Sequence, residues 1–104
     1  MKVPQIDSIP VPVLARFYGI VITMFFRDHN PPHIHAYGGR AGKSAEWAAQ
    51  IAIRTGVVIA GNVPDVARRL LRDWIRLHED ELLAAWNRAL VGQEPGRIAP
   101  MRVR

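Results

Sequence analysis

The spacing of hydrophobic and polar positions changes along the chain, and this change predicts a sheet followed by a helix. Residues 17–27 are β-branched and aromatic, and this run predicts a strand. Its alternate apolar positions share one face: Ile20, Ile22, Met24 and Phe26. The Asn30-Pro31-Pro32 sequence then interrupts strand pairing, because proline has no N–H to donate. Residues 33–37 predict a second strand, which ends at two glycines.

The segment 44–54 carries two conflicting signals. Its alanines favour a helix, yet its larger apolar side chains recur at every second position, as in a strand. Thr55-Gly56 and the apolar run 57–60 then look like the return of a hairpin, so the period of two decides in favour of a strand. These segments predict an antiparallel meander of three to four strands.

The C-terminal part of the chain has the spacing of an amphipathic helix. Pro64 suits the first helical turn, and Gly92 suits the end. One stripe of side chains recurs at helical spacing: Leu71, Trp74, His78, Leu82, Ala85 and Ala89. A straight helix over 64–91 would be about 42 Å long, which exceeds a domain with a radius of gyration of about 13 Å. Either the helix bends near His78 to Glu81, which we favour, or its end packs on a second copy in a homodimer.

The predicted fold class is therefore α+β. A small antiparallel sheet of three to four strands is followed by a long or kinked C-terminal helix, which packs on one face of the sheet. The 104 residues suffice for one domain, predicted over 14–94. A proline-containing extended lead-in over 1–13 precedes it, and a basic tail over 95–104 follows.

Composition narrows the classes of function. The chain has no cysteine, which excludes disulfides, thiolate zinc sites and a cysteine nucleophile, and suits a reducing cytoplasm. No apolar stretch approaches the roughly 20 residues that span a bilayer, and the first 12 residues lack the apolar core of a secretory signal, so we expect no membrane association. The net charge is +5, and 12 of the 14 basic residues are arginine. This charge leans weakly towards nucleic acid or an acidic partner, although coding bias explains it equally well.

Four arginines lie on the outer face of the predicted helix: Arg68, Arg69, Arg72 and Arg76. Asp73 and Asp80 follow two of them by four residues, which is the spacing of ion pairs within a helix. We therefore expect a solvated, ion-paired face. As a nucleic-acid footprint, the pattern is unspecific.

Residues 38–44 end in the Gly-Lys-Ser of a phosphate-binding loop. The full pattern needs a glycine five positions before Gly42, where this chain has Tyr37. Such a loop also opens a helix, whereas a strand is expected here. We therefore exclude ATP or GTP binding at this segment.

The histidine-rich segment 28–35 is the strongest candidate site. In a strand, His33 and His35 point to the same face with β-carbons about 6.6 Å apart, so both imidazoles can reach one metal ion such as zinc. His29 is a candidate third ligand. Asp28 is a candidate ligand, or a residue that accepts a hydrogen bond from a liganding imidazole and orients it. His78 joins this site only if the helix crosses the same face. Otherwise it lies at the edge of the core.

Two other interpretations of this segment stay open. Asp28 and the histidines can simply stabilise the diproline bend. Alternatively, His33 or His35 acts as acid or base in a small nuclease, with Arg27 or Arg40 stabilising the phosphoryl transition state.

Residues 16–22 and 24–38, with the Asp-His-X-Pro-Pro-His-X-His sequence, closely resemble a bacterial family of unknown function, DUF4160. Similar segments recur downstream, at 61–64, 74–78, 81–86 and 98–101. The resemblance covers roughly residues 12–101. Ile34 departs from the phenylalanine that is more frequent in the family, and the lead-in is longer.

The resemblance implies no settled activity. Members of the family are often encoded beside another small domain, in an arrangement similar to toxin–antitoxin pairs. We therefore expect one component of a toxin–antitoxin-like two-gene system, which binds a small partner protein encoded nearby and also RNA or DNA. The alternatives are a histidine-dependent nuclease and a metal-binding domain without catalysis.

Overall fold

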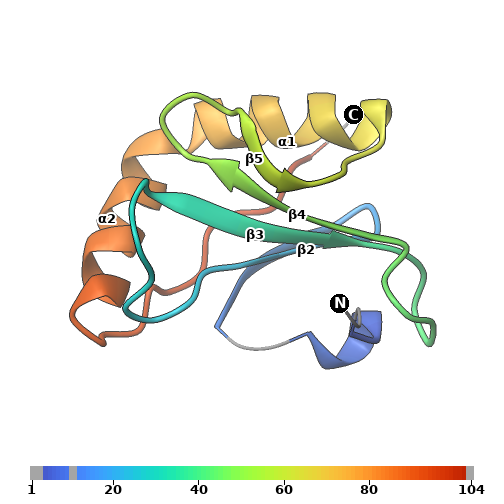
Figure 1. The fold of residues 1–104 in the computed structure, drawn as a ribbon, viewed down its shortest axis with the longest axis horizontal. Coiled ribbons are helices and arrows are strands. Elements are labelled where there is room, and N and C mark those ends of the chain that lie inside the picture. Colours follow the sequence, from blue (N-terminus) through green and yellow to red (C-terminus); the bar gives the residue numbers. More distant parts are fainter. Residues whose placement is uncertain (1–3, 10–11, 103–104) are drawn as a thin grey trace.

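Five antiparallel strands and two helices form the protein in the computed structural model, which describes residues 4–9 and 12–102 (Figure 1). The strands follow one another in spatial order, β1-β2-β3-β4-β5, so that each hairpin joins neighbours. Their bounds are β1 Val13–Phe17, β2 Ile20–Thr23, β3 His33–Gly38, β4 Trp47–Ala52 and β5 Val58–Gly61. The helices are α1 Asp65–Leu77 and α2 Glu79–Leu90, and a short 3-10 turn, η1, covers Ile6–Ser8.

The meander has five strands, so the prediction of three to four was too low. The run predicted as one strand over 17–27 contains a turn, because Tyr18 and Gly19 both have positive φ, at 48° and 74°. A turn with two positive φ angles matches the twist of a tight hairpin. The additional strand, β1, comes largely from residues before the predicted run. The strands predicted at 33–37 and within 44–54 are confirmed as β3 and β4.

The main core lies between the helices and one face of the sheet. Alternate residues of β2 and β3 enter it, among them Ile22 and Ile34, which are fully buried. From the helices, the predicted stripe supplies Leu71, Trp74, Leu82, Ala85 and Ala89. The expected packing of the C-terminal helical region on one face of the sheet is therefore confirmed.

The helical region is divided in two, which corrects the expectation of one long or kinked helix. His78 separates α1 from α2 with φ −114° and ψ 23°. The longest dimension of the molecule is 32 Å, shorter than the straight helix of about 42 Å would need. The division falls within the stretch where a bend was expected, and Figure 1 shows α2 turning across the end of the sheet.

The opposite face of the sheet carries a smaller core. Ile6 and Ile9 of the N-terminal segment cover Val13 and Val21 there, with Tyr37 packed against them. At the other end of the chain, the N–H of Ile98 donates to the carbonyl of Leu14 at 3.0 Å. Parts of the predicted lead-in and the last two residues of the predicted tail lie outside the described residues. Neither α1 nor α2 has the length and apolar character that crossing a membrane requires.

Candidate metal centre

The alternation of side chains along β3 places its histidines and its apolar core residues on opposite faces of the strand. Ile34 and Ala36 face the helices and are fully buried. His33 and His35 therefore lie on the opposite face, as the sequence predicted. They are nevertheless shielded from water, with only 1% and 9% of their surfaces exposed.

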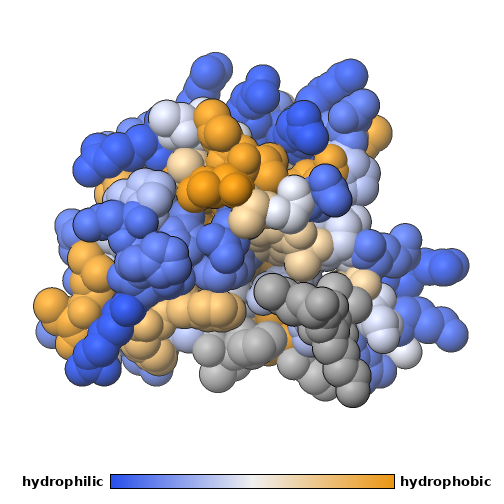
Figure 2. Space-filling view, viewed as in Figure 1, coloured by the Kyte–Doolittle hydropathy of each residue, from blue (hydrophilic) through white to orange (hydrophobic). Residues whose placement is uncertain are grey.

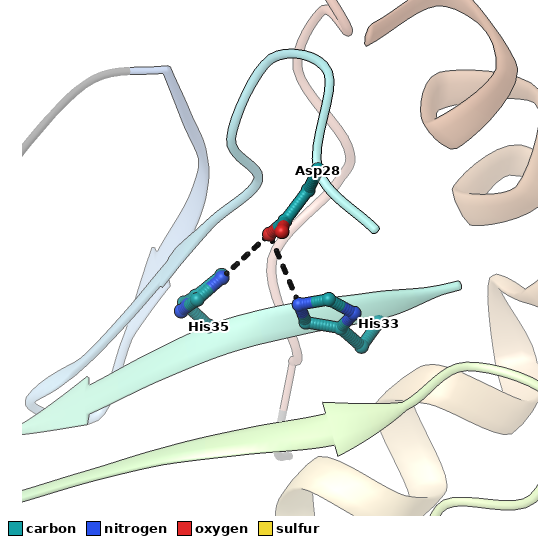
Figure 3. Close-up of side chains that lie close together, drawn as sticks. All are labelled: Asp28, His33 and His35. Atoms are coloured by element: carbon teal, nitrogen blue, oxygen red, sulfur yellow. Dashed lines mark hydrogen bonds and ion pairs between the residues drawn. The ribbon is translucent and has the colours of Figure 1, made fainter. Parts of the chain in front are cut away.

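The loop between β2 and β3 folds back and brings Asp28 over these two imidazoles (Figure 3). The Oδ2 atom of Asp28 lies 3.0 Å from Nε2 of His33 and 3.1 Å from Nε2 of His35. Two main-chain hydrogen bonds hold the ends of the loop. The N–H of Arg27 donates to the carbonyl of Ala89 in α2, and the carbonyl of Pro32 accepts from Ile53. The three side chains thus meet at one point, and we call Asp28, His33 and His35 the triad.

A hydrogen bond of the His33 ring determines which of its two nitrogens carries the hydrogen when the imidazole is neutral. Its Nδ1 lies 2.7 Å from the carbonyl oxygen of Pro31, which can only accept, so Nδ1 carries a hydrogen. In the neutral imidazole, Nε2 then presents a lone pair. This Nε2 is fully buried and has no hydrogen-bond partner within the described part of the chain, although Asp28 is 3.0 Å away. The contact is short but lacks the geometry of a hydrogen bond.

His35 is held differently. Its ring stacks on Phe25, with centroids 4.0 Å apart and planes at 22°. Its Nε2 forms a hydrogen bond with Oδ2 of Asp28, in which the carboxylate accepts. Stacking and hydrogen bonding together fix the direction in which this nitrogen points.

The triad has the dimensions of a metal site. Bonds of about 2.0–2.1 Å place neighbouring ligand atoms about 2.9 Å apart in octahedral geometry and about 3.3 Å apart in tetrahedral geometry. The two contacts to Asp28, at 3.0 and 3.1 Å, fall in this range. All three potential ligand atoms lie within 4.8 Å of one another.

The protonation states around the triad also suit a cation. Burial raises the pKa of Asp28, but the hydrogen bonds from His35 and from the His29 N–H and the charge of nearby imidazoles outweigh it, so the pKa is lowered overall. Burial lowers the pKa of His35 more than its hydrogen bond to Asp28 raises it. A charged carboxylate and a neutral imidazole are the forms that bind metal ions.

A second buried polar atom near the triad has no partner. Thr23 is fully buried, and its Oγ1 has no hydrogen-bond partner among residues 4–9 and 12–102. Thr23 pairs with His35 across β2 and β3, so both side chains lie on the same face. Thr23 and Phe25 were not predicted from the sequence as site residues. The strand register places Thr23 beside His35, and the path of the loop after β2 brings Phe25 onto the same ring.

The other candidate residues lie around or away from the triad. His29 is 82% exposed, and its Nδ1 contacts the second oxygen of Asp28, Oδ1, at 3.0 Å. It therefore contacts Asp28 on the solvent side, through the carboxylate oxygen that does not face His33 and His35. His78 is held elsewhere, with its Nδ1 2.9 Å from Glu81 and its ring beside Trp74.

Neither candidate arginine contacts the triad. The guanidinium of Arg27 lies against Gly92, just beyond the end of α2, where a β-carbon on the glycine would come within 2.6 Å of it. Arg40 follows the far end of β3, and its Nε lies 3.7 Å from Glu46 at the surface. The structure thus places both away from the histidines that they were expected to assist.

A shallow hollow of about 150 Å³ adjoins the triad on the uncovered part of the sheet face. His35 forms one wall. The other lining residues are small or polar: Tyr37, Ala48, Ala49, Gln50, Ala60 and Gly61. A ligand in this hollow would be in contact with one ring of the triad.

Comparison with known proteins gives one match. The family model described as "Domain of unknown function (DUF4160)" matches residues 19–87, about two thirds of the chain, and this stretch contains the whole triad. No curated protein and no solved structure matches the chain.

Proposed function

The chain belongs to the DUF4160 family, whose description states no function, and we propose from its site that the protein binds one divalent transition-metal ion through Asp28, His33 and His35. Nε2 of each histidine and Oδ2 of the aspartate would be the ligand atoms, and the ion would replace the proton that Nε2 of His35 donates to Asp28. The expected small partner protein and the toxin–antitoxin-like role stay predictions, since nothing in the site bears on them.

The observation that carries this proposal is the unpartnered Nε2 of His33. A lone pair 3.0 Å from a carboxylate oxygen is repelled unless a positive charge lies between them. A proton on Nε2 would satisfy the charge but would not point at Oδ2, because the contact lacks hydrogen-bond geometry. In a metal site, each ligand's lone pair points at the ion and not at the neighbouring ligand. A short contact off the hydrogen-bond direction is what such a site produces.

The donor atoms indicate which ions fit. Two imidazole nitrogens and one carboxylate oxygen suit zinc, iron, cobalt, nickel or manganese better than calcium or magnesium, which prefer all-oxygen sites. Three protein ligands also leave at least one coordination position open. A further ligand in the hollow beside His35 would contact one ring of the triad. Zinc is the first ion to test, since it binds tightly to such donors.

A direct test measures the metal content of tag-free protein after dialysis against zinc. The wild type should retain about one ion per chain, and His33→Leu should retain none, since ligands at this spacing hold zinc. His29→Ala and His78→Gln are matched controls, because each removes a histidine outside the triad. Retention below about 0.1 ion per chain by the wild type would remove the proposal. Equal retention by His33→Leu would assign the metal to another site.

A further inference from the structure

The outer face of α1 has more uncompensated positive charge than its sequence predicted. The expected ion pairs from Arg69 to Asp73 and from Arg76 to Asp80 are not formed within 4.0 Å. Within the described residues, the arginine–carboxylate ion pair that does form joins Arg40 to Glu46, outside this helix. The face therefore presents Arg68, Arg69, Arg72 and Arg76 to solvent, and all four side chains are exposed.

A fifth arginine converges on this face from the sheet. Arg54 lies in the turn between β4 and β5, and it lines a small hollow of about 90 Å³ with Arg72 and Arg76 of α1. Thr55 and Gly56, in the same turn as Arg54, also line it. We call this feature the arginine hollow. Its remaining lining consists of Ile53, Ile75 and Glu79.

Glu79 does not neutralise the arginine hollow. In the described chain, its carboxylate lies within 4.0 Å of none of the three guanidinium groups. Three guanidinium groups and one carboxylate leave a formal charge of +2 at this point. An anion that accepts hydrogen bonds from several directions would relieve the mutual repulsion of the arginines.

We propose that the arginine hollow binds a phosphate group of a nucleic-acid backbone. A phosphodiester offers two charged oxygens and accepts from more than one guanidinium at a time. The row of arginines continues along α1 to Arg68, about 12 Å from Arg76 along the helix axis. A polymer with regularly spaced phosphates can contact the whole row, whereas a single small anion cannot. The net charge of +5 attracts such a polymer over longer distances.

The surface around the hollow is consistent with a polar ligand. Figure 2 shows long hydrophilic side chains projecting along the edge of the molecule where α1 lies. Ile53 directly precedes Arg54, and its N–H donates to the carbonyl of Pro32, the residue before His33. The arginine hollow and the triad therefore lie at the same end of the sheet. The proposal does not depend on the metal, because none of its contacts involves the triad.

The test measures binding of a fluorescent single-stranded RNA of about 20 nucleotides to metal-free protein at several salt concentrations. The double variant Arg72→Gln/Arg76→Gln removes two guanidinium groups from the hollow. Its affinity should fall about tenfold, and the slope of log K against log salt should become shallower by about 0.7, the value for one lost phosphate contact on a single strand. Single-stranded DNA of the same sequence should show the same change, since contacts to phosphate ignore the sugar.

The matched control is Arg16→Gln/Arg40→Gln, which removes the same charge from exposed positions on β1 and after β3. It should alter affinity and slope much less. An equal loss in both double variants would mean that net charge alone attracts RNA, and this overturns the proposal. The absence of salt-dependent RNA binding would also overturn the proposal. If inorganic phosphate shifts the amide resonances of Thr55 and Gly56 but the protein binds no RNA, the hollow binds a small anion and not a nucleic-acid backbone, and the proposal is wrong. Glutamine is a good helix former, so both variants should fold. Circular dichroism checks this.

Discussion

Nε2 of His33 lies 3.0 Å from Oδ2 of Asp28, buried and without a hydrogen bond between them. Elsewhere in proteins, nearly all buried polar groups have a partner, and a group without one requires a physical reason, such as strain, a catalytic role, or a bound water or ion. Here Nδ1 of the same ring is already engaged by Pro31, so the ring cannot turn without breaking that bond. The contact is therefore a fixed feature of the loop, and it leads to predictions that separate a metal site from a structural bend.

Asp28→Asn should weaken metal binding while sparing the fold. The amide replaces a charged ligand with a neutral one, so we expect zinc affinity to fall at least about tenfold, equivalent to 1.4 kcal/mol. In the metal-free protein, the amide oxygen can still accept the hydrogen bond from Nε2 of His35. The metal-free free energy of unfolding should therefore change by less than about 1 kcal/mol. Isothermal titration calorimetry and urea denaturation measure the two quantities.

A different result would favour the structural interpretation of the segment. If the charged Asp28 mainly stabilises the loop, then Asp28→Asn should lower the metal-free free energy of unfolding clearly. Zinc affinity would then be weak in both proteins.

Zinc should stabilise the wild type against thermal unfolding, because a ligand that binds only the folded state adds RT ln(1 + [L]/Kd). At a concentration of free zinc about 100 times Kd, the gain is about 2.7 kcal/mol. His33→Leu should show no gain, and His29→Ala should keep most of it, because His29 is exposed and contacts only the outer oxygen of Asp28. Calorimetric scans with zinc and with a chelator compare the three proteins. A full gain in His33→Leu would contradict the triad.

The stability of the metal-free protein should depend on the pKa of His35. Burial lowers this pKa below its ordinary value of 6.5, so the unfolded state takes up the proton first as the pH falls. Stability is therefore greatest above 6.5, and it is lost as the pH decreases through the folded-state pKa. Denaturation series in urea at stepped pH measure this loss. His35→Gln should flatten the part of the profile nearest 6.5, and an unchanged profile in that variant would refute the assignment.

Many of the helices and strands were predictable, because the spacing of apolar residues along the sequence follows which side chains are buried. The helical stripe from Leu71 to Ala89 and the alternation within 44–54 both mark side chains that enter the main core. Tyr18 was not predictable in the same way. A positive φ at a tyrosine contradicts its local preference, so the turn that divides 17–27 is imposed by the pairing of β1 with β2.

Part of the candidate site was also predictable from the spacing of residues. The period of two in a strand places His33 and His35 on one face, and the structure agrees. The selection of Asp28 over His29 and His78 depends on how the loop returns over the sheet. That path is held by hydrogen bonds to Ala89 and Ile53, which are distant in sequence and carry no local signal. For the same reason, the sequence did not show that Arg27 points at Gly92.

Gly38→Ala should destabilise the sheet at its end farthest from the triad. Gly38 pairs with Trp47 across β3 and β4, and a β-carbon at this glycine would lie 2.0 Å from the indole ring. The ring must move, and overpacking of this kind costs about 1–3 kcal/mol. Urea denaturation measures the loss. In the double variant Gly38→Ala/Trp47→Leu, the smaller side chain removes the clash, so the two effects should be strongly non-additive. The single variant Trp47→Leu completes the comparison. Additive effects would show that the indole does not oppose the new methyl group, and zinc binding at the triad should be unchanged in both single variants and in the double variant.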